Sequence, residues 1–172
     1  MKAYQGKEED IVPASSSHMA EDEIYGEEDR KYRISFWVND AFKEAKSHSD
    51  AEMLHTYAPG DAYGSEGTFP YLAIQFDDEI YDAVEEFKET GTFSGAIELT
   101  ALSGKFYFKA KMEYYGDMMY FYGLDRCDGA WENNGLCMVY QKVYMGTENE
   151  RRLMQVLDEA AGSYREERIE ED

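Results

Sequence analysis

Apolar and polar residues alternate through residues 92–144 in four successive runs, which glycine-bearing turns separate. A period of two residues is typical of β-strands that bury one face of a sheet. In the run Lys105–Tyr114, one face would carry Phe106, Phe108, Ala110 and Met112, and the other would carry Lys105, Tyr107, Lys109, Lys111 and Glu113. We therefore predict a sheet with one face in the core and the other in water.

Two-residue turns that contain glycine connect neighbouring antiparallel strands. Such turns occur at Ser103–Gly104, Gly116–Asp117 and Asn134–Gly135. They divide the segment into four predicted strands, at residues 93–102, 105–114, 118–122 and 136–144, with a polar excursion over residues 123–135 that ends in the Asn134–Gly135 turn. An antiparallel meander is the simplest topology for strands connected in this way.

The residues before this segment predict two more strands and a helix. Lys31–Val38 alternates apolar and polar residues and is rich in β-formers, and residues 71–76 form a shorter apolar run. Between them, the apolar residues of 40–57 follow an incomplete helical stripe, which favours a helix broken near Ser49. The glycine- and proline-rich residues 58–70 then predict a long loop.

Two segments carry clear helix signals. Asp78–Glu89 has apolar residues at helical spacing, acidic residues at its start and Gly91 after its end. Thr147 and Glu150 match a capping box, and the apolar residues that follow predict a final helix. The inward faces would be formed by Ile80, Tyr81, Val84, Phe87 and Lys88 in the first helix and by Leu153, Met154, Val156, Leu157 and Ala160 or Ala161 in the second.

These elements predict an α+β fold, an antiparallel meander sheet of about five to six strands packed with two to three helices. A single domain would cover residues 31–165. Residues 1–30 are acidic and show no periodicity, which predicts a disordered tail, and residues 166–172 would form a charged C-terminal tail. The run Ser15–Met19 is also typical of a cloning junction, in which case the natural chain would start at Met19.

The net charge narrows the range of partners. The chain of 172 residues contains 37 acidic and 17 basic residues, which gives a formal net charge of −20. Long-range repulsion disfavours DNA, RNA and anionic membranes as direct ligands, whereas basic proteins are attracted. We therefore expect a basic protein as the partner.

The sequence contains no apolar run of membrane-spanning length and no signal-peptide pattern, so we expect a cytoplasmic protein. Its two cysteines, Cys127 and Cys137, are too few for a disulfide framework. The sequence leaves open whether one disulfide joins them across the predicted hairpin.

Motifs that would identify a reaction or a cofactor are missing. The sequence has no G-x-S-x-G elbow, no P-loop and no G-x-G-x-x-G fingerprint. His48, Glu52 and His55 would share one face of a continuous helix, as a metal site requires, but they do not form H-E-x-x-H. We therefore expect a protein that is not an enzyme and has no cofactor, with a metal-dependent domain at these three residues as a second alternative.

Two further clusters have simpler explanations than ligand binding. Oxygens around Cys127 could hold calcium, but turn chemistry explains their residue types equally well; they belong to Asp125, Asp128, Glu132 and Asn133. A basic, aromatic stripe resembles a small platform for single-stranded nucleic acid, but with this net charge it more simply balances neighbouring acids; it comprises Lys105, Tyr107, Lys109 and Lys111.

Acidic residues concentrate in the N-terminal segment, on the predicted helix 78–89 and after Asp158. On that helix, the outward face would carry the candidate partner-binding residues Asp78, Asp82, Glu85, Glu86 and Glu89. A row of carboxylates on a helix can imitate a phosphate backbone.

Our leading hypothesis is an inhibitor that occupies the DNA- or RNA-binding surface of an enzyme. In charge and size it is similar to DNA mimics of the anti-restriction and anti-CRISPR type, although no motif identifies one. The alternative is an immunity or antitoxin-like protein that neutralises a basic toxin.

Overall fold

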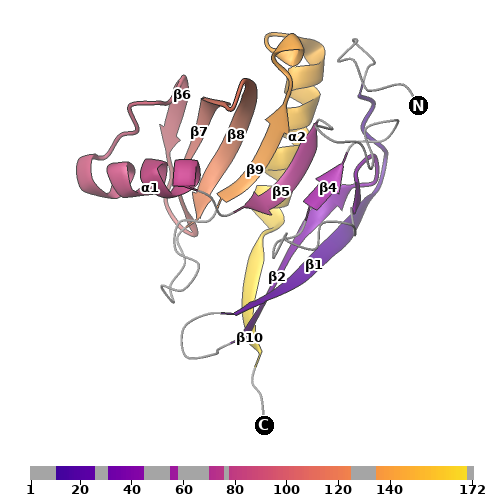
Figure 1. Cartoon of the computed structure of the whole chain (residues 1–172). Helices are drawn as coiled ribbons and strands as arrows, with labels where there is room; N and C mark the ends of the chain where they lie inside the picture. The colour runs from indigo at the N-terminus through magenta and orange to yellow at the C-terminus, as the bar shows by residue number, and fades with distance from the viewer. Residues whose placement is uncertain are drawn as a thin grey trace.

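A computed structural model gives the structure of the chain and describes residues 11–25, 31–44, 55–57, 70–75, 78–124 and 135–169. Two α-helices and two antiparallel sheets are present in these residues (Figure 1). The predicted α+β class is confirmed. No helix in this part of the chain is long and apolar enough to cross a membrane.

The larger sheet has seven strands in the order β3-β4-β5-β9-β8-β7-β6. Their bounds are β3 Lys43–Glu44, β4 His55–Tyr57, β5 Tyr71–Gln75, β6 Glu98–Ala101, β7 Phe106–Tyr114, β8 Asp117–Leu124 and β9 Gly135–Tyr140. Strands β6 to β9 each pair with the next strand along the chain, so the predicted meander is confirmed there. Strand β5 pairs with β9, and the connection from β5 to the edge strand β6 therefore runs across the sheet through α1 (Asp78–Thr90).

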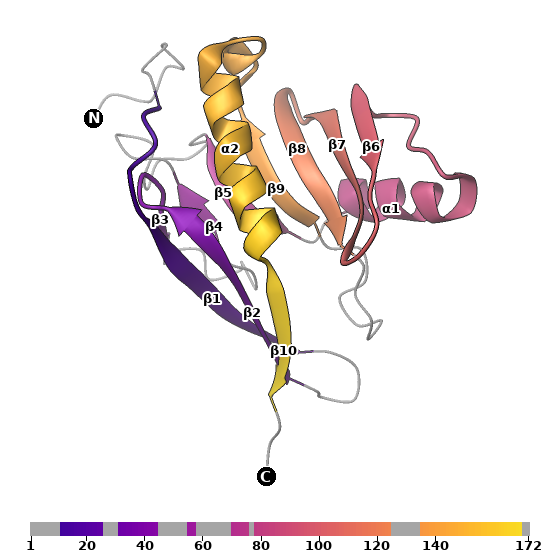
Figure 2. The same ribbon diagram turned by 180° about the vertical axis from the view of Figure 1, so that it is seen from behind.

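The smaller sheet has the order β1-β2-β10 and joins both ends of the described chain. Its strands are β1 Ser17–Tyr25, β2 Lys31–Asn39 and β10 Arg165–Ile169. Helix α2 (Glu148–Ser163) precedes β10, and a 3₁₀ turn, η2 (Lys142–Tyr144), precedes α2. Figure 2 shows α2 on the face of the large sheet opposite α1 and next to the small sheet.

Two hydrophobic cores lie on the two faces of the large sheet. One core joins β5, β8 and β9 to α1, and the other joins the same strands to α2 and β2. All six residues of β9 are buried, and the five that follow Gly135 alternate between the two cores. The expectation that one face of this sheet meets water is therefore wrong for its central strands, whereas the edge strand β6 is largely exposed. The continuous apolar run of β9 is typical of a strand that is covered on both sides.

A β-bulge changes the predicted alternation of β7. Phe106 pairs with Leu124 and Phe108 pairs with Gly123, so Tyr107 is an extra residue between them. As a result, Phe106 packs on the α2 side against Tyr122, at a ring-centroid distance of 5.1 Å, and Phe108 packs on the α1 side. Phe106 therefore does not share a face with Phe108, as the simple period of two had predicted.

The predicted disordered tail is not confirmed for residues 11–25. Strand β1 pairs with β2 along its whole length, and the Ile11 N–H donates to Asn149 Oδ1 at 2.9 Å. The acidic residues are accommodated because alternate side chains leave the core; Glu23, for example, pairs with Lys31 at 2.9 Å. At the other end, β10 pairs with β2, so the predicted C-terminal tail is a strand as far as Ile169.

The predicted helix over residues 40–57 is wrong at both of its described ends. Lys43–Glu44 and His55–Tyr57 are short strands that pair with each other, and Thr56 is fully buried opposite Leu72 of β5. A strand partner distant in the sequence therefore outweighs the incomplete helical pattern. The predicted break near Ser49 and the loop up to residue 69 lie outside the described residues.

The contact between α1 and the sheet gives a stability prediction at Gly123. A Cβ on this residue would lie 2.8 Å from Phe108 Cε1 and 3.2 Å from Val84 Cγ2, both in fully buried side chains. We expect Gly123→Ala to lower the free energy of unfolding by about 1–3 kcal/mol, measured by urea denaturation. Gly162→Ala in α2, where nothing lies within 4 Å of the added Cβ, should raise it by up to about 1 kcal/mol. Equal effects of the two substitutions would contradict this account of packing.

Candidate functional site

Helix α1 buries a narrow stripe and directs its acidic residues away from the sheet. Ile80, Ala83 and Val84 are buried, and the ring of Phe87 lies 4.8 Å from that of Phe108 between centroids. This anchoring fixes the helix against the core beneath it. The face opposite the stripe is therefore held in one orientation.

Four carboxylates form a straight row on this outward face. Asp78, Asp82, Glu85 and Glu89 follow one another at offsets of four, three and four residues. Because an α-helix turns about 100° and rises about 1.5 Å per residue, these positions lie in one line, separated by about 4.5–6 Å along the axis. We call these four residues the acidic ridge.

The acidic ridge is little neutralised by its neighbours. Glu85 lies 3.4 Å from Lys88 Nζ and accepts a long hydrogen bond from Tyr81. Within the described part of the chain, no ion pair involves Asp78, Asp82 or Glu89. Three of the four carboxylates therefore have no ion pair with any lysine or arginine that the structure describes.

Glu86, the fifth predicted partner-binding residue, has a different role from the other four. Its carboxylate accepts hydrogen bonds from Ser94 N–H at 2.6 Å and from Ser94 Oγ at 3.0 Å. These contacts fix the turn that follows α1. Glu86 also lies beside the acidic ridge rather than on it, so we assign it to the support of the site.

The structure describes only one of the three predicted metal ligands, His55. His55 belongs to β4, where it pairs with Ala73, so the helical face that would have joined it to His48 and Glu52 does not extend to it. His48 and Glu52 lie outside the described residues, as do Asp125, Cys127, Asp128, Glu132 and Asn133. Among the residues that the structure describes, no group of three or more His, Cys, Asp or Glu could hold a metal ion. Cys137 is buried on β9, and its sulfur lies 3.8 Å from Gln75 Oε1.

Lys109 and Lys111 of β7, and Lys105 just before this strand, are paired inside the molecule. Each faces a carboxylate of the C-terminal segment: Lys111 lies 3.0 Å from Glu150, Lys109 lies 2.7 Å from Asp158, and Lys105 lies 3.9 Å from Glu166. Tyr107 packs on the α1 side instead, near Phe87. The basic stripe is therefore used to dock α2 and β10, and its charge is balanced by acids of these elements.

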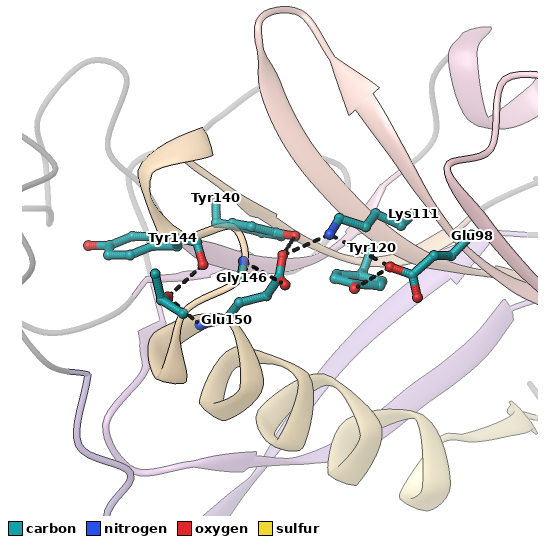
Figure 3. Close-up of polar contacts among 8 residues, drawn as sticks. Glu98, Lys111, Tyr120, Tyr140, Tyr144, Gly146 and Glu150 are labelled. Atoms are coloured by element: carbon teal, nitrogen blue, oxygen red, sulfur yellow. Dashed lines mark hydrogen bonds and ion pairs between the residues drawn. The ribbon is translucent and has the colours of Figure 1, made fainter.

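Lys111 is the centre of a polar network between the sheet and α2 (Figure 3). Its ammonium group is bound by Glu150, lies 3.7 Å from Glu98, and belongs to a residue that is only 5% exposed. Glu150 also accepts hydrogen bonds from the Tyr140 hydroxyl and, at 3.2 Å, from Gly146 N–H. The capping box had indicated only the local role of Glu150. Its pairing with a lysine 39 positions earlier could not be found from local spacing.

The network predicts a pH dependence of stability. Burial raises the pKa of Glu150, but hydrogen bonds from Tyr140, Lys111 and Gly146 outweigh this effect and leave the pKa below its usual 4.5. This carboxylate therefore adds stability above about pH 4.5, and the contribution is lost as the pH falls through the folded-state pKa. Between about pH 5 and pH 3, the free energy of unfolding from urea titrations should fall more steeply for the wild type than for Glu150→Gln. Parallel curves would contradict the assignment.

The acidic ridge is the candidate site, since its carboxylates are exposed on a fixed helix and can attract ammonium and guanidinium groups. The internal network, in contrast, has its charges already paired. Comparisons with family models, with curated proteins and with solved structures found no match to this chain.

Proposed function

We propose that this protein is an acidic binding protein that inhibits a nucleic-acid-binding enzyme by occupying its basic DNA- or RNA-binding surface. In this proposal the protein acts by association and performs no reaction itself. The acidic ridge on α1 makes the central contact with the partner. The straight row of four outward carboxylates is the observation that carries the proposal.

The spacing of the ridge supports contact with a surface built for phosphates. A DNA strand carries one charge per about 3.4 Å of helix axis, and the ridge carries one per about 4.5–6 Å. Cationic side chains arranged along a nucleic-acid channel would therefore meet a carboxylate at nearly every turn of α1. Because α1 is anchored by its buried stripe, little conformational entropy is lost when these contacts form.

The charge of the whole molecule supports the same partner. A net charge of −20 steers a cationic protein toward this surface and increases the association rate at low salt. Lys105, Lys109 and Lys111 weaken this field little, because each is neutralised by a carboxylate of α2 or β10. The negative potential of α1 is therefore directed at solvent.

A competition experiment tests the proposal. Proteins of the source cell that bind heparin would be passed over the immobilised full-length chain, and a retained enzyme would be purified. We expect the protein to displace fluorescent DNA or RNA from that enzyme, and to lose affinity at least tenfold between about 50 and 200 mM salt. Retention of a toxin that excess DNA does not displace would favour the immunity alternative. Retention of no basic protein would refute the proposal.

A further inference from the structure

Strand β6 is one edge of the large sheet, and its outer side pairs with no strand among the described residues. The Leu102 N–H donates to the Tyr107 carbonyl of the neighbouring chain segment at 3.0 Å. Because the direction of the backbone groups alternates along an antiparallel strand, the N–H and C=O groups of Leu99 and Ala101 point away from β7. Residues 98 and 100–102 are exposed, so these groups lie at an edge that is open to solvent.

Unlike the other strand edges in the described part of the chain, β6 has little protection against pairing with another chain. Proteins commonly protect sheet edges with charged residues or proline. Consecutive charged residues occupy positions 21–23 of β1, positions 165–168 of β10 and both positions of β3, which form the other three edges. Strand β6 has only four residues, but the segment 97–103 around it contains no proline, and Glu98 is its only charged residue. The edge of β6 is therefore suited to strand pairing.

Helix α1 crosses the sheet toward this edge. Along the helix, Ile80 lies over β9, Val84 lies over β8 and Phe87 lies over β7. The last turn of α1 therefore approaches β6, and Figures 1 and 2 both show the helix extending beyond that strand. A strand added to β6 would have α1 on one side of it, as the neighbouring strands do.

The two faces of β6 would present different side chains to an added strand. On the α1 face, Leu99 packs against the core of that side. On the opposite face, the Glu98 side chain is 62% exposed. A residue opposite Glu98 in an antiparallel pair would have its Cβ about 4.5–5.5 Å away, close enough for a lysine or arginine to reach the carboxylate. A strand that alternates apolar and basic residues therefore fits β6.

Electrostatics favours a cationic segment at this edge. Besides Glu98, the last turn of α1 contributes Glu89, which belongs to the acidic ridge. The C-terminal end of a helix also carries a partial negative charge that attracts cations. Lys88 is the single basic residue of α1, and it lies 3.4 Å from Glu85. The net charge of −20 adds long-range attraction for a basic protein.

A second copy of this chain does not fit the same edge. Antiparallel pairing of β6 with β6 of another copy would place a two-fold axis perpendicular to the sheet, so both α1 helices would lie on the same face. Because α1 extends beyond β6, the two helices would then overlap. Two chains with a net charge of −20 also repel each other. The occupant is therefore a segment of a different protein.

We infer that β6 is a docking edge for an extended segment of a cationic protein, which pairs as an antiparallel strand with Leu99 and Ala101. The inference rests on the proposed function only in placing this segment on the inhibited enzyme. In strand addition, main-chain hydrogen bonds provide affinity and the alternating side chains provide specificity. The acidic ridge and the docking edge then bind two parts of the same partner.

Hydrogen exchange with a defined probe tests the pairing. The probe is a short peptide of alternating lysine and valine, and its control has glutamate in place of lysine. The lysine peptide should slow exchange of the Leu99 and Ala101 amides at least about tenfold, because both N–H groups become hydrogen-bonded. The glutamate peptide should leave them unchanged. Absence of protection, or equal protection by both peptides, would overturn the inference.

A proline at position 101 tests the same edge by substitution. Ala101→Pro removes an outward N–H that the fold does not use, and proline is tolerated at such positions of edge strands. Its affinity for the lysine peptide, measured by fluorescence anisotropy, should fall at least about tenfold, whereas Ala101→Val keeps the N–H and should bind like the wild type. Unchanged affinity of Ala101→Pro would overturn the inference. A dimer of the chain alone that Ala101→Pro dissociates would also overturn it.

A competition assay separates this inference from the proposed function. It uses the enzyme retained on the immobilised chain. If Ala101→Pro displaces nucleic acid from this enzyme as strongly as the wild type does, the docking edge is wrong and the acidic ridge stands. If the lysine peptide protects β6 but no nucleic-acid-binding enzyme is retained, the docking edge stands and the proposed function fails.

Discussion

Replacing Glu150 with alanine is expected to lower the free energy of unfolding by about 3–5 kcal/mol. The substitution removes the nearest carboxylate of Lys111, whose side chain is almost completely buried between the sheet and α2. A buried charge that loses its partner keeps its full desolvation penalty. The Tyr140 hydroxyl and Gly146 N–H also lose their acceptor, so three donors are affected by one substitution. Urea denaturation at pH 7 would measure the loss.

Glu148 offers a matched control on the same helix. It pairs with Arg151 at 2.7 Å, but the two side chains are 53% and 72% exposed. Glu148→Ala should therefore cost less than about 1 kcal/mol. Adding Lys111→Met to Glu150→Ala should recover at least about 1 kcal/mol, because it removes a buried ammonium whose remaining carboxylate, that of the exposed Glu98, lies 3.7 Å away. If the double variant were less stable than Glu150→Ala alone, the explanation through an unpaired charge would be wrong.

The sequence predicted the elements whose signals are local. The Asp78–Glu89 helix, observed as α1 (Asp78–Thr90), combines apolar spacing with acidic residues at its start, and Thr147 caps α2 as expected. A two-residue turn with a glycine also joins β7 to β8; it is formed by Tyr115 and Gly116, one residue before the predicted Gly116–Asp117. In each case, the residues that determine the structure lie within a few positions of one another.

The other elements of the fold depend on strands that are distant in the sequence and pair with them. Strands β1 and β10 form because both edges of β2 accept a strand, and no spacing within either segment reveals that partner. The short strand β4 replaces a predicted helix because β5 pairs with it. The bulge at Tyr107 changes the face of Phe106 without any glycine or proline in that strand to indicate it. Such cases follow the rule that tertiary pairing overrides weak local preference.

The candidate site, like the fold, was predictable from the sequence where it depends on local spacing and not where it depends on distant residues. The outward row on α1 follows from helical periodicity, because the apolar stripe alone determines which residues face away from the core. Predicting the separate role of Glu86 would have required the position of Ser94, which is known only from the folded turn. Predicting that Lys105, Lys109 and Lys111 form ion pairs within the molecule likewise required the positions of α2 and β10.

Reversal of the acidic ridge should abolish inhibition without unfolding the protein. In the variant Asp78→Lys, Asp82→Lys, Glu85→Lys and Glu89→Lys, each substitution changes the charge by two, so the formal net charge becomes −12 instead of −20. We expect at least a 100-fold loss of affinity for the basic enzyme, because each attractive contact becomes a like-charge contact. A lysine at position 78 interacts unfavourably with the helix dipole, which lowers the free energy of unfolding by about 0.3–1 kcal/mol. Relief of repulsion between the carboxylates raises the free energy of unfolding. The melting temperature should therefore change by only a few degrees.

A control with the same net charge separates the ridge from the overall field. Replacing four exposed acidic residues away from α1 with lysine also gives a formal net charge of −12. Suitable residues are Glu21, Glu148, Glu159 and Glu167. This control should reduce the association rate to a similar extent, since steering depends on total charge, but it should leave the dissociation rate nearly unchanged. The ridge variant should increase the dissociation rate as well, because its contacts lie in the interface. If surface plasmon resonance gave the same two rates for both variants, the protein would act through its net charge, and α1 would not be its binding site.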